Sequence, residues 1–401
     1  MSDHDLTLTQ PVRLPLVQGA RYKFVTVLLG LVAAILLGEL LLRAILPPQD
    51  RFYVWPPHFQ STLHPNPDNL PGISGEALFK VNSAGIRGEE FTTEQTYRIL
   101  AVGGSTTECL YLNQTEVWTS LLERKLSEAK HKAIWVGNVG RSGHNTRHHL
   151  LQMKYLIPQF PKIDAVIILA GVNDVHIKLS DLEYDPETTT KPTFEEEYMR
   201  AAFAIAPPAI PAYHYKRLAW WRMAKKLKDH YLTKAKAQPI QDSTGETLSQ
   251  WRRYRHNAEE IVETIPDLST ALGEYRRNLN AIVDVAQQRA VRPILVTQPT
   301  IWRSDLSQDE KDLLWMGGIG SFQLGKGHKY YSASSLDKII QQYNETLLDV
   351  CRTRAIDCID LAGALPKDKT VFYDDVHFNE SGARQVADVL SRQMAQRVLS
   401  H

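Results

Sequence analysis

Cysteine is scarce in this chain: there are three among 401 residues, and none of them stands in a CxxC pair. This scarcity excludes a disulfide-rich scaffold and a paired-cysteine zinc site. Basic and acidic residues number 46 and 45, so the net charge is +1 and nothing in the balance favours nucleic acid as a partner. Internal repeats and low-complexity tracts are also absent. The 43% of hydrophobic residues instead predict a folded chain with a large core and room for more than one domain.

A single long apolar run covers residues 24–46, and only Glu39 and Arg43 break it. Its length suits a bilayer-spanning helix, and the basic residues before it, without an obvious cleavage signal after it, favour a retained anchor over a signal peptide. We therefore expect a cytoplasmic tail over residues 1–23 and a single-pass anchor, with the rest of the chain on the periplasmic or extracytoplasmic side. Glu39 and Arg43, four residues apart, are expected to form an interfacial ion pair without a further role.

Residues 47–97 are rich in proline, asparagine, glycine and aromatic residues, and we expect them to link the anchor to a following domain and to wrap one side of it. That domain, residues 98–398, begins with three cycles in which an apolar strand ends in a glycine-containing turn before a helix. The strands are 99–102, 133–136 and 165–169, and the turns are Gly103 to Ser105, Asn138 to Asn145 and Gly171 to Asp174. This rhythm predicts an α/β fold whose parallel sheet has helices on both faces and binds ligands at its carboxyl edge.

Residues 178–266 interrupt the rhythm and are too many for a plain loop, so we expect a helical insertion. Because it leaves the sheet directly after Asn173, it is a candidate lid. Its aromatic and basic run, 213–222, can stack on sugars, rest among lipid head groups, or bury its rings in a core of its own. Beyond the insertion, the pattern predicts helices over 268–289, 335–352 and 379–399, with strands over 293–297 and up to 360.

Three polar residues suggest catalysis. Ser105 follows two glycines at the start of a helix, where free N–H groups can stabilise an oxyanion, although a serine at this place can also be a simple helix cap. Asp374 stands three residues before His377, which allows the carboxylate to orient an imidazole that takes a proton from serine. The spacing favours Asp374 over Asp375 for this role. Aspartate and histidine before a helix are, however, often capping or surface residues.

The four blocks GGS, NxGxxG, GxND and DxxH, in this order, resemble the SGNH or GDSL hydrolase superfamily, and in particular its membrane-anchored bacterial-type members. The resemblance covers about residues 98–398 and implies a three-layer, flavodoxin-like sheet and ester hydrolysis without a cofactor. It implies that Ser105 is the nucleophile and that Asp374 and His377 complete the triad. Gly143 and Asn173 would join the Ser105 amide in the oxyanion hole. The first block departs from the name-giving GDS because Gly104 replaces the aspartate; residues 82–88 and the anchor also look like the anchored members.

Other polar residues and the cysteines receive less specific predictions. The histidines at 144, 148 and 149 suggest a metal site, but no carboxylate or cysteine set accompanies them, and we predict no metal. Asp174 is expected to stabilise its turn. Cys351 and Cys358 can form a disulfide outside the cytoplasm, but buried free thiols are the favoured alternative, and Cys109 is expected to remain a thiol.

The sequence therefore predicts a membrane-anchored serine esterase that cleaves an ester of an envelope lipid or glycan. One alternative is an O-acetyltransferase that passes the acyl group to a sugar hydroxyl. The other is a catalytically silent scaffold that binds glycan in the envelope. The blocks leave the substrate and the oligomeric state open, because specificity in such folds resides in loops and insertions.

Overall fold

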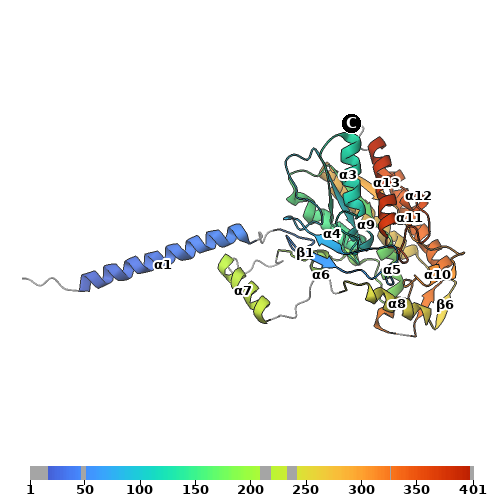
Figure 1. Ribbon diagram of the computed structural model, residues 1–401, viewed down its shortest axis with the longest axis horizontal. Helices are drawn as coiled ribbons and strands as arrows, with labels where there is room; N and C mark the ends of the chain where they lie inside the picture. Colours follow the sequence, from blue (N-terminus) through green and yellow to red (C-terminus); the bar gives the residue numbers. More distant parts are fainter. Residues whose placement is uncertain (1–16, 47–50, 208–217, 233–241, 326, 398–401) are drawn as a thin grey trace, which may run out of the picture. The chain divides into compact units, whose positions relative to one another are not determined.

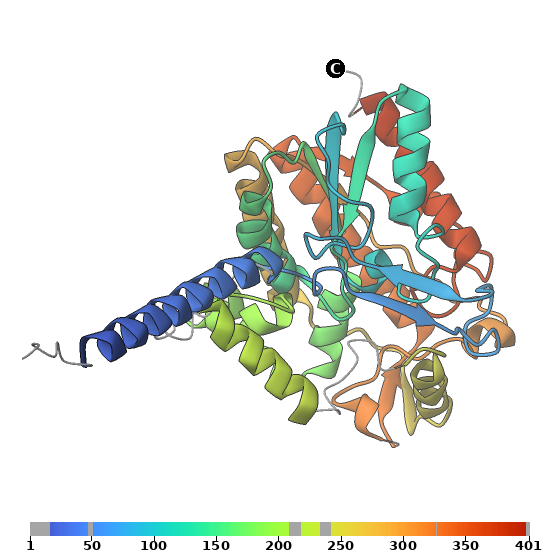
Figure 2. The same cartoon turned by 60° about the vertical axis from the view of Figure 1, so that its left-hand side comes forward.

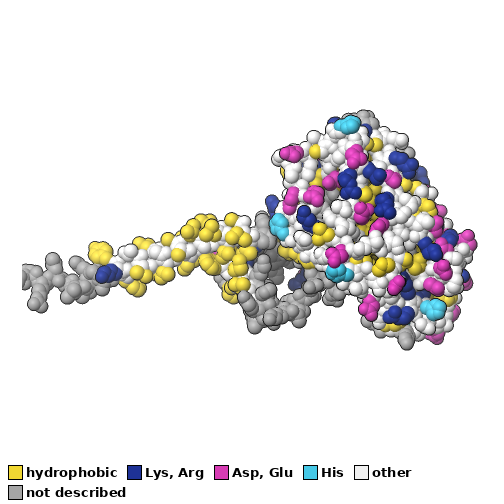
Figure 3. All heavy atoms as spheres, viewed as in Figure 1, with side chains coloured by type: hydrophobic (Ala, Val, Ile, Leu, Met, Phe, Trp, Pro, Cys, Tyr) yellow, Lys and Arg dark blue, Asp and Glu magenta, His cyan; other side chains and the backbone are white. Residues whose placement is uncertain are grey.

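The computed structural model describes residues 17–46, 51–207, 218–232, 242–325 and 327–397. The chain divides into two compact units, one of residues 1–49 and 210–236 and the other of residues 50–209 and 237–401. In the first unit lie helix α1 (Val17–Ile45) and helix α7 (Ala219–Leu232). Residues 22–45 of α1 have a mean hydropathy of 2.6 and are long and apolar enough to cross a membrane, as Figure 3 shows by the apolar side chains along the helix.

The second unit is built on a five-stranded parallel sheet with the order β4-β3-β5-β7-β9. The strands are β3 (Tyr97–Gly103), β4 (Ile134–Asn138), β5 (Ala165–Leu169), β7 (Arg292–Val296) and β9 (Asp357–Ile359). In the centre of the sheet Leu100 is level with Val166, and Ile167 is level with Ile294. These strands are apolar almost without interruption because both of their faces are buried under helices. The expected α/β fold is confirmed.

Helices cover both faces of the sheet, as Figures 1 and 2 show. On one side α3 (Trp118–Lys130) packs beside α13 (Glu380–Arg397); on the other lie α4 (Thr146–Leu156), α9 (Ser269–Gln288) and α11 (Ala333–Arg354). The two helix layers follow from the strand order, because right-handed crossovers in opposite directions place their helices on opposite faces. The chain first adds β4 on one side of β3, and then adds β5, β7 and β9 in turn on the other side of β3. Because the direction reverses beside β3, a crevice opens at the carboxyl ends of β3 and β5.

Smaller elements surround this core. A hairpin of β1 (Gln60–Leu63) and β2 (Ala77–Lys80) precedes the sheet, and β6 (Glu260–Val262) pairs with β8 (Lys329–Tyr331). The short helices are α2 (Ser105–Glu108), α5 (Val172–Ser180), α6 (Phe194–Ala202), α8 (Glu246–His256), α10 (Gln308–Lys311) and α12 (Leu361–Ala364), with 3-10 turns at Ile157–Gln159, Thr188–Thr190 and Phe322–Leu324. In the described part of the insertion, α6, α7 and α8 are helical, as expected. Residues 213–217 of its aromatic and basic run lie outside the described residues.

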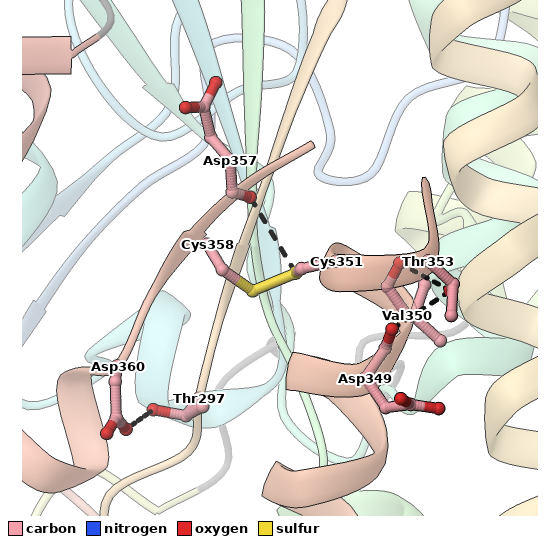
Figure 4. The surroundings of a disulfide bond; sticks show 8 residues. All are labelled: Thr297, Asp349, Val350, Cys351, Thr353, Asp357, Cys358 and Asp360. Carbon is pink, nitrogen blue, oxygen red and sulfur yellow. Dashed lines mark hydrogen bonds between the residues drawn. A yellow bond between two sulfur atoms is a disulfide. The ribbon is translucent and has the colours of Figure 1, made fainter. Parts of the chain in front are cut away.

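Cys351, near the end of α11, and Cys358, in β9, form a disulfide with their Cα atoms 6.0 Å apart (Figure 4). The expectation of two free thiols is therefore wrong. Ala355 takes a positive φ of 50° and ends α11, which turns the chain back so that β9 passes the last turn of the helix. Cys109 remains a buried thiol, as expected.

Candidate active site

Ser105 begins α2 directly after β3, at the carboxyl edge of the sheet, and its Oγ lies 2.8 Å from His377 Nε2. The two preceding glycines are needed for close approach. A Cβ at Gly104 would lie 2.2 Å from Asn173 Nδ2, and a Cβ at Gly103 would lie 2.9 Å from the carbonyl oxygen of Leu169. The turns after β3, β4 and β5 can therefore converge on the serine only if these positions carry no side chain.

Asp374 and His377 occupy one tight turn before α13. Asp374 Oδ1 accepts hydrogen bonds from the backbone N–H groups of Val376 (3.0 Å) and His377 (2.8 Å), and its Oδ2 lies 2.6 Å from His377 Nδ1. Trp315, from the loop after β7, donates its indole N–H to the same Oδ2 at 3.0 Å. Burial raises the pKa of Asp374, but the adjacent His377 and the hydrogen bonds outweigh it, so its pKa is lowered and the carboxylate is charged.

The charge on Asp374 decides the state of His377. Burial disfavours the imidazolium, but the attraction of Asp374 outweighs this effect and raises the pKa of His377. In the neutral ring the proton on Nδ1 faces the carboxylate, which leaves Nε2 as the acceptor for the Ser105 hydroxyl. The Tyr373 ring stacks on the imidazole with a centroid distance of 5.4 Å and an interplanar angle of 13°. Both the tautomer and the ring plane are therefore fixed.

Three residues that line the cavity beside the Ser105 hydroxyl have N–H groups that can donate to a substrate. The backbone N–H groups of Ser105 and Gly143 have no acceptor among the described residues. Asn173 donates one side-chain N–H to the carbonyl of His144 at 2.8 Å, which orients the amide and leaves its second N–H available. Ser105, Gly143 and Asn173 line one cavity. Such a set of donors can stabilise an oxyanion.

This cavity, about 290 Å³ in volume, has mostly apolar and aromatic walls. They come from Leu110, Tyr111, Leu248, Trp251, Trp315, Met316, Tyr373 and Val376. Leu248 and Trp251 belong to α8, so the end of the insertion forms part of the wall. The sequence blocks do not identify Leu248, Trp251, Trp315 and Met316 because these four residues lie far from the catalytic motifs along the chain.

His176 adds a polar group to the apolar wall. It lies on α5 one turn beyond Asn173, lines the cavity, and presents its ring to Trp315 and Phe322 at centroid distances of 6.2 and 5.8 Å. Burial lowers its pKa to about 4, so the ring is neutral at neutral pH. No described side chain or carbonyl hydrogen-bonds its ring nitrogens. A bound substrate can therefore use them.

Buried charged groups support the turn around the nucleophile. The Arg87 guanidinium donates to the carbonyls of Glu108 (2.5 Å), Cys109 (2.9 Å) and Leu112 (2.7 Å), which holds the chain directly after α2. The Glu108 carboxylate accepts a hydrogen bond from Ser142, the residue before Gly143. Arg87, from the stretch 82–88, and Glu108 thus support the Ser105 turn.

The remaining polar candidates have structural partners. Asp375 accepts hydrogen bonds from the Trp302 indole and from the backbone of Trp315 and Met316 rather than from His377. Asp174 accepts from the backbone N–H and the hydroxyl of Thr146, which ties the turn after β5 to the start of α4.

The histidine cluster is also held by protein groups. His144 Nε2 lies 3.0 Å from the carbonyl of Ala201, and His148 Nδ1 lies 2.9 Å from the Asn145 side chain. Burial lowers the pKa of His148 to about 4 and that of His149 to about 3. Within the described ranges, no group of three or more histidine, cysteine or acidic residues could hold a metal ion.

The chain is similar to one protein family and to several solved structures. The model of the GDSL-like lipase/acylhydrolase family matches residues 101–385. Similar solved structures include an α/β hydrolase from the Lake Arreo metagenome (13% identity, 75% of this chain and 96% of that chain, TM-score 0.39). An acetylxylan esterase from Geobacillus stearothermophilus has 14% identity over 76% of this chain and 96% of its own, with a TM-score of 0.39. A lipase/acylhydrolase from Enterococcus faecalis has 15% identity over 75% and 97%, with a TM-score of 0.40. No curated protein sequence matches the chain.

Proposed function

This chain belongs to the GDSL-like lipase/acylhydrolase family and is an ester-hydrolysing enzyme, and from that premise we propose that it works through a triad of Ser105, His377 and Asp374. The observation that carries the proposal is the continuous hydrogen-bonded line through these residues. It runs from Ser105 Oγ to His377 Nε2 at 2.8 Å and from His377 Nδ1 to Asp374 Oδ2 at 2.6 Å. The line combines a nucleophile, a base and a group that orients the base.

The reaction follows from the positions of these groups. Ser105 Oγ attacks the ester carbonyl while His377 Nε2 takes its proton, and Asp374 stabilises the imidazolium. The developing oxyanion accepts hydrogen bonds from the N–H groups of Ser105, Gly143 and Asn173. His377 then protonates the leaving alcohol, and an acyl group remains on Ser105. A water molecule attacks this acyl group with His377 as the base, which releases the acid and restores the hydroxyl.

We further propose that the substrate is an ester of an envelope lipid or glycan and that α1 anchors the enzyme in the membrane as a single-pass helix. The apolar helix α1 supports anchoring. The cavity supports a substrate with both apolar and polar parts, since its aromatic walls surround the neutral His176 ring. The basic residues before the apolar run 24–46 favour the periplasmic or extracytoplasmic side for the catalytic domain.

Active-site labelling tests the triad. Ser105→Ala should abolish labelling by a fluorophosphonate and lower the hydrolysis of p-nitrophenyl acetate by about a thousandfold or more, because the triad acts as a unit. Ser269→Ala is the matched control: this serine is exposed at the start of α9 and should label like the wild type. Labelling that persists in Ser105→Ala, or activity within tenfold of wild type, contradicts the assignment. A screen of short-chain, long-chain and glycan esters then identifies the substrate.

A further inference from the structure

The insertion contributes a helix to the unit that contains the apolar anchor, and this helix is held by specific contacts. We propose that α7 docks on the carboxyl-terminal half of α1 and lies against the lipid bilayer, as a second membrane-contacting helix of the chain. This inference rests on the proposed anchoring by α1. It assigns a partner, the lipid surface, to a segment for which the sequence leaves three alternatives open.

Glu39 joins the two helices. Its carboxylate accepts hydrogen bonds from the backbone N–H of Ala219 at 2.8 Å and of Trp220 at 3.2 Å, the first two residues of α7. The first turn of a helix leaves its N–H groups without intrahelical acceptors, and a carboxylate at this end is favoured by the helix dipole. Arg43 also donates to Glu39, at 2.8 Å. The expected Glu39–Arg43 pair therefore exists, but Glu39 has the further role of capping α7.

Gly38 provides the space for this contact. The Trp220 indole donates its N–H to the carbonyl of Ile35 at 3.0 Å. A Cβ at Gly38 would lie 2.1 Å from Trp220 Cζ2, so the indole can reach the α1 backbone only because residue 38 has no side chain. Gly30, on the same helix, has nothing within 4 Å of such a Cβ. The hydrogen bonds and the close approach described above involve residues 35–43 of α1.

The exposed apolar and aromatic side chains around this contact favour lipid as the binding partner. Leu218, Trp220, Trp221 and Leu227 are each 44–47% exposed, and the apolar side chains of α1 beside them are exposed along the helix (Figure 3). Tryptophan is enriched at membrane–water interfaces, and amphipathic helices with tryptophan and leucine on one face lie in that interface. The sequence places the same end of α1 at the far interface of the bilayer.

The same contacts favour a retained helix over a cleaved signal sequence. Removal of α1 would take away the acceptor of the Ala219 and Trp220 N–H groups and would leave the Trp220 indole N–H without its carbonyl. An anchor that remains in the protein keeps all of these hydrogen bonds.

A lipid-quenching experiment on the full chain tests the proposal. Leu227→Cys carries an environment-sensitive fluorophore in vesicles of phosphatidylcholine and phosphatidylglycerol, a fraction of which bear quenchers on their acyl chains. Leu28→Cys, in the middle of α1, is the reference for insertion. Labelling is selective because Cys109 is buried and Cys351 and Cys358 are bonded. We expect quenching at 227 to be about half of that at 28 or more, as for an interfacial helix.

Paired glycine variants test the docking contact. Gly38→Leu should displace the Trp220 indole and reduce quenching at 227 about threefold or more. Gly30→Leu should leave the quenching unchanged. Absence of quenching at 227 or at 28, or equal quenching in the two variants, overturns the proposal. Hydrolysis of p-nitrophenyl acetate by Gly38→Leu should remain at the wild-type level, so a failure of the docking proposal is distinguishable from a failure of the Ser105 assignment.

Discussion

Two adjacent buried aspartates, Asp374 and Asp375, should respond differently to the same substitution. Both side chains are fully buried. Asp374 contacts the His377 imidazole, whereas Asp375 holds the loop that contains Trp302 and Trp315. We predict that Asp374→Asn removes nearly all catalysis, whereas Asp375→Asn lowers the stability and keeps kcat/KM within about tenfold of wild type.

The cost of Asp375→Asn follows from its hydrogen bonds. Oδ1 accepts from Trp302 Nε1 at 2.7 Å, and Oδ2 accepts from the backbone N–H groups of Trp315 at 2.7 Å and Met316 at 3.2 Å. Asparagine replaces one of the two acceptor oxygens by an NH2 group, so the N–H donors on that side lose their acceptor. A lost hydrogen bond to a charged group costs about 1.5–3 kcal/mol. Burial and the charge of Asp374 raise the pKa of Asp375, so neutralisation offsets part of this cost.

The net destabilisation by Asp375→Asn should be about 2 kcal/mol, which for a unit of this size corresponds to a fall in Tm of about 3 °C. Asp374→Asn should instead lower kcat/KM by about three to four orders of magnitude, because an amide facing His377 favours the wrong tautomer. Thermal unfolding gives the first quantity. Hydrolysis of p-nitrophenyl acetate, measured where circular dichroism shows both variants to be folded, gives the second.

The comparison between these two variants can refute the assignment. Asp375→Asn should keep kcat/KM within about tenfold of wild type, since only the placement of Trp315 links it to the triad. Equal losses of activity in the two folded variants would show that the sequence spacing and the hydrogen-bond geometry do not separate their roles. A folded Asp374→Asn with nearly full activity would remove Asp374 from the triad.

Three other predictions concern the same region. Asn173→Ala should lower kcat about a hundredfold and change KM little, because it removes one oxyanion donor of three; a change in KM alone would argue against that role. The pKa of His377 is raised above its ordinary value of 6.5, so the inactive imidazolium persists to a higher pH than for a free histidine. As pH decreases, kcat/KM should therefore fall with a midpoint above pH 6.5. A midpoint at or below pH 6.5 in the pH–rate profile contradicts the assignment. Burial raises the pKa of Asp174 from 3.8 to about 7, so folding favours its protonated form. This stabilisation is fully present below pH 3.8 and is lost as pH rises from there to about 7. Urea unfolding of Asp174→Asn should therefore show a weaker pH dependence in this range than the wild type.

The parts of the fold that are encoded locally could be predicted from the sequence. Strands β3 and β5 are short runs of apolar residues bounded by glycine turns, and their period and boundaries are visible in the chain itself. The Asp374–His377 turn is equally local, since two hydrogen bonds join its first residue, Asp374, to its last, His377. Ser105, Gly143 and Asn173 follow the carboxyl ends of parallel strands, and the structure brings them to one cavity with His377, while Asp374 lies buried against His377.

Contacts between distant segments could not be predicted in this way. Trp315 reaches Asp374 from 59 residues away, and its position depends on Asp375, which the motif offers only as a competing triad residue. The cavity wall from α8 depends on how the insertion returns to the sheet. The disulfide depends on the change of chain direction at Ala355, which has a left-handed conformation. Alanine rarely adopts this conformation, so the sequence does not predict it. Each of these features is fixed by tertiary packing.

The contact between α1 and α7 is nevertheless indicated by two features of the sequence. One is the absence of a capping residue before α7, and the other is the acid Glu39 in α1. Leu218 precedes α7, and leucine is a poor N-cap residue, so the first N–H groups of the helix lack a local acceptor. Glu39 is the one acid in the apolar span, and Arg43 supplies only one of the hydrogen bonds that its carboxylate accepts. The N–H groups of Ala219 and Trp220 satisfy that carboxylate, and the carboxylate satisfies them. The two features are therefore complementary: one helix begins without a capping residue, and the other contains an acid in an apolar span. Together they predict that the two helices are in contact, although the residues concerned are 180 positions apart.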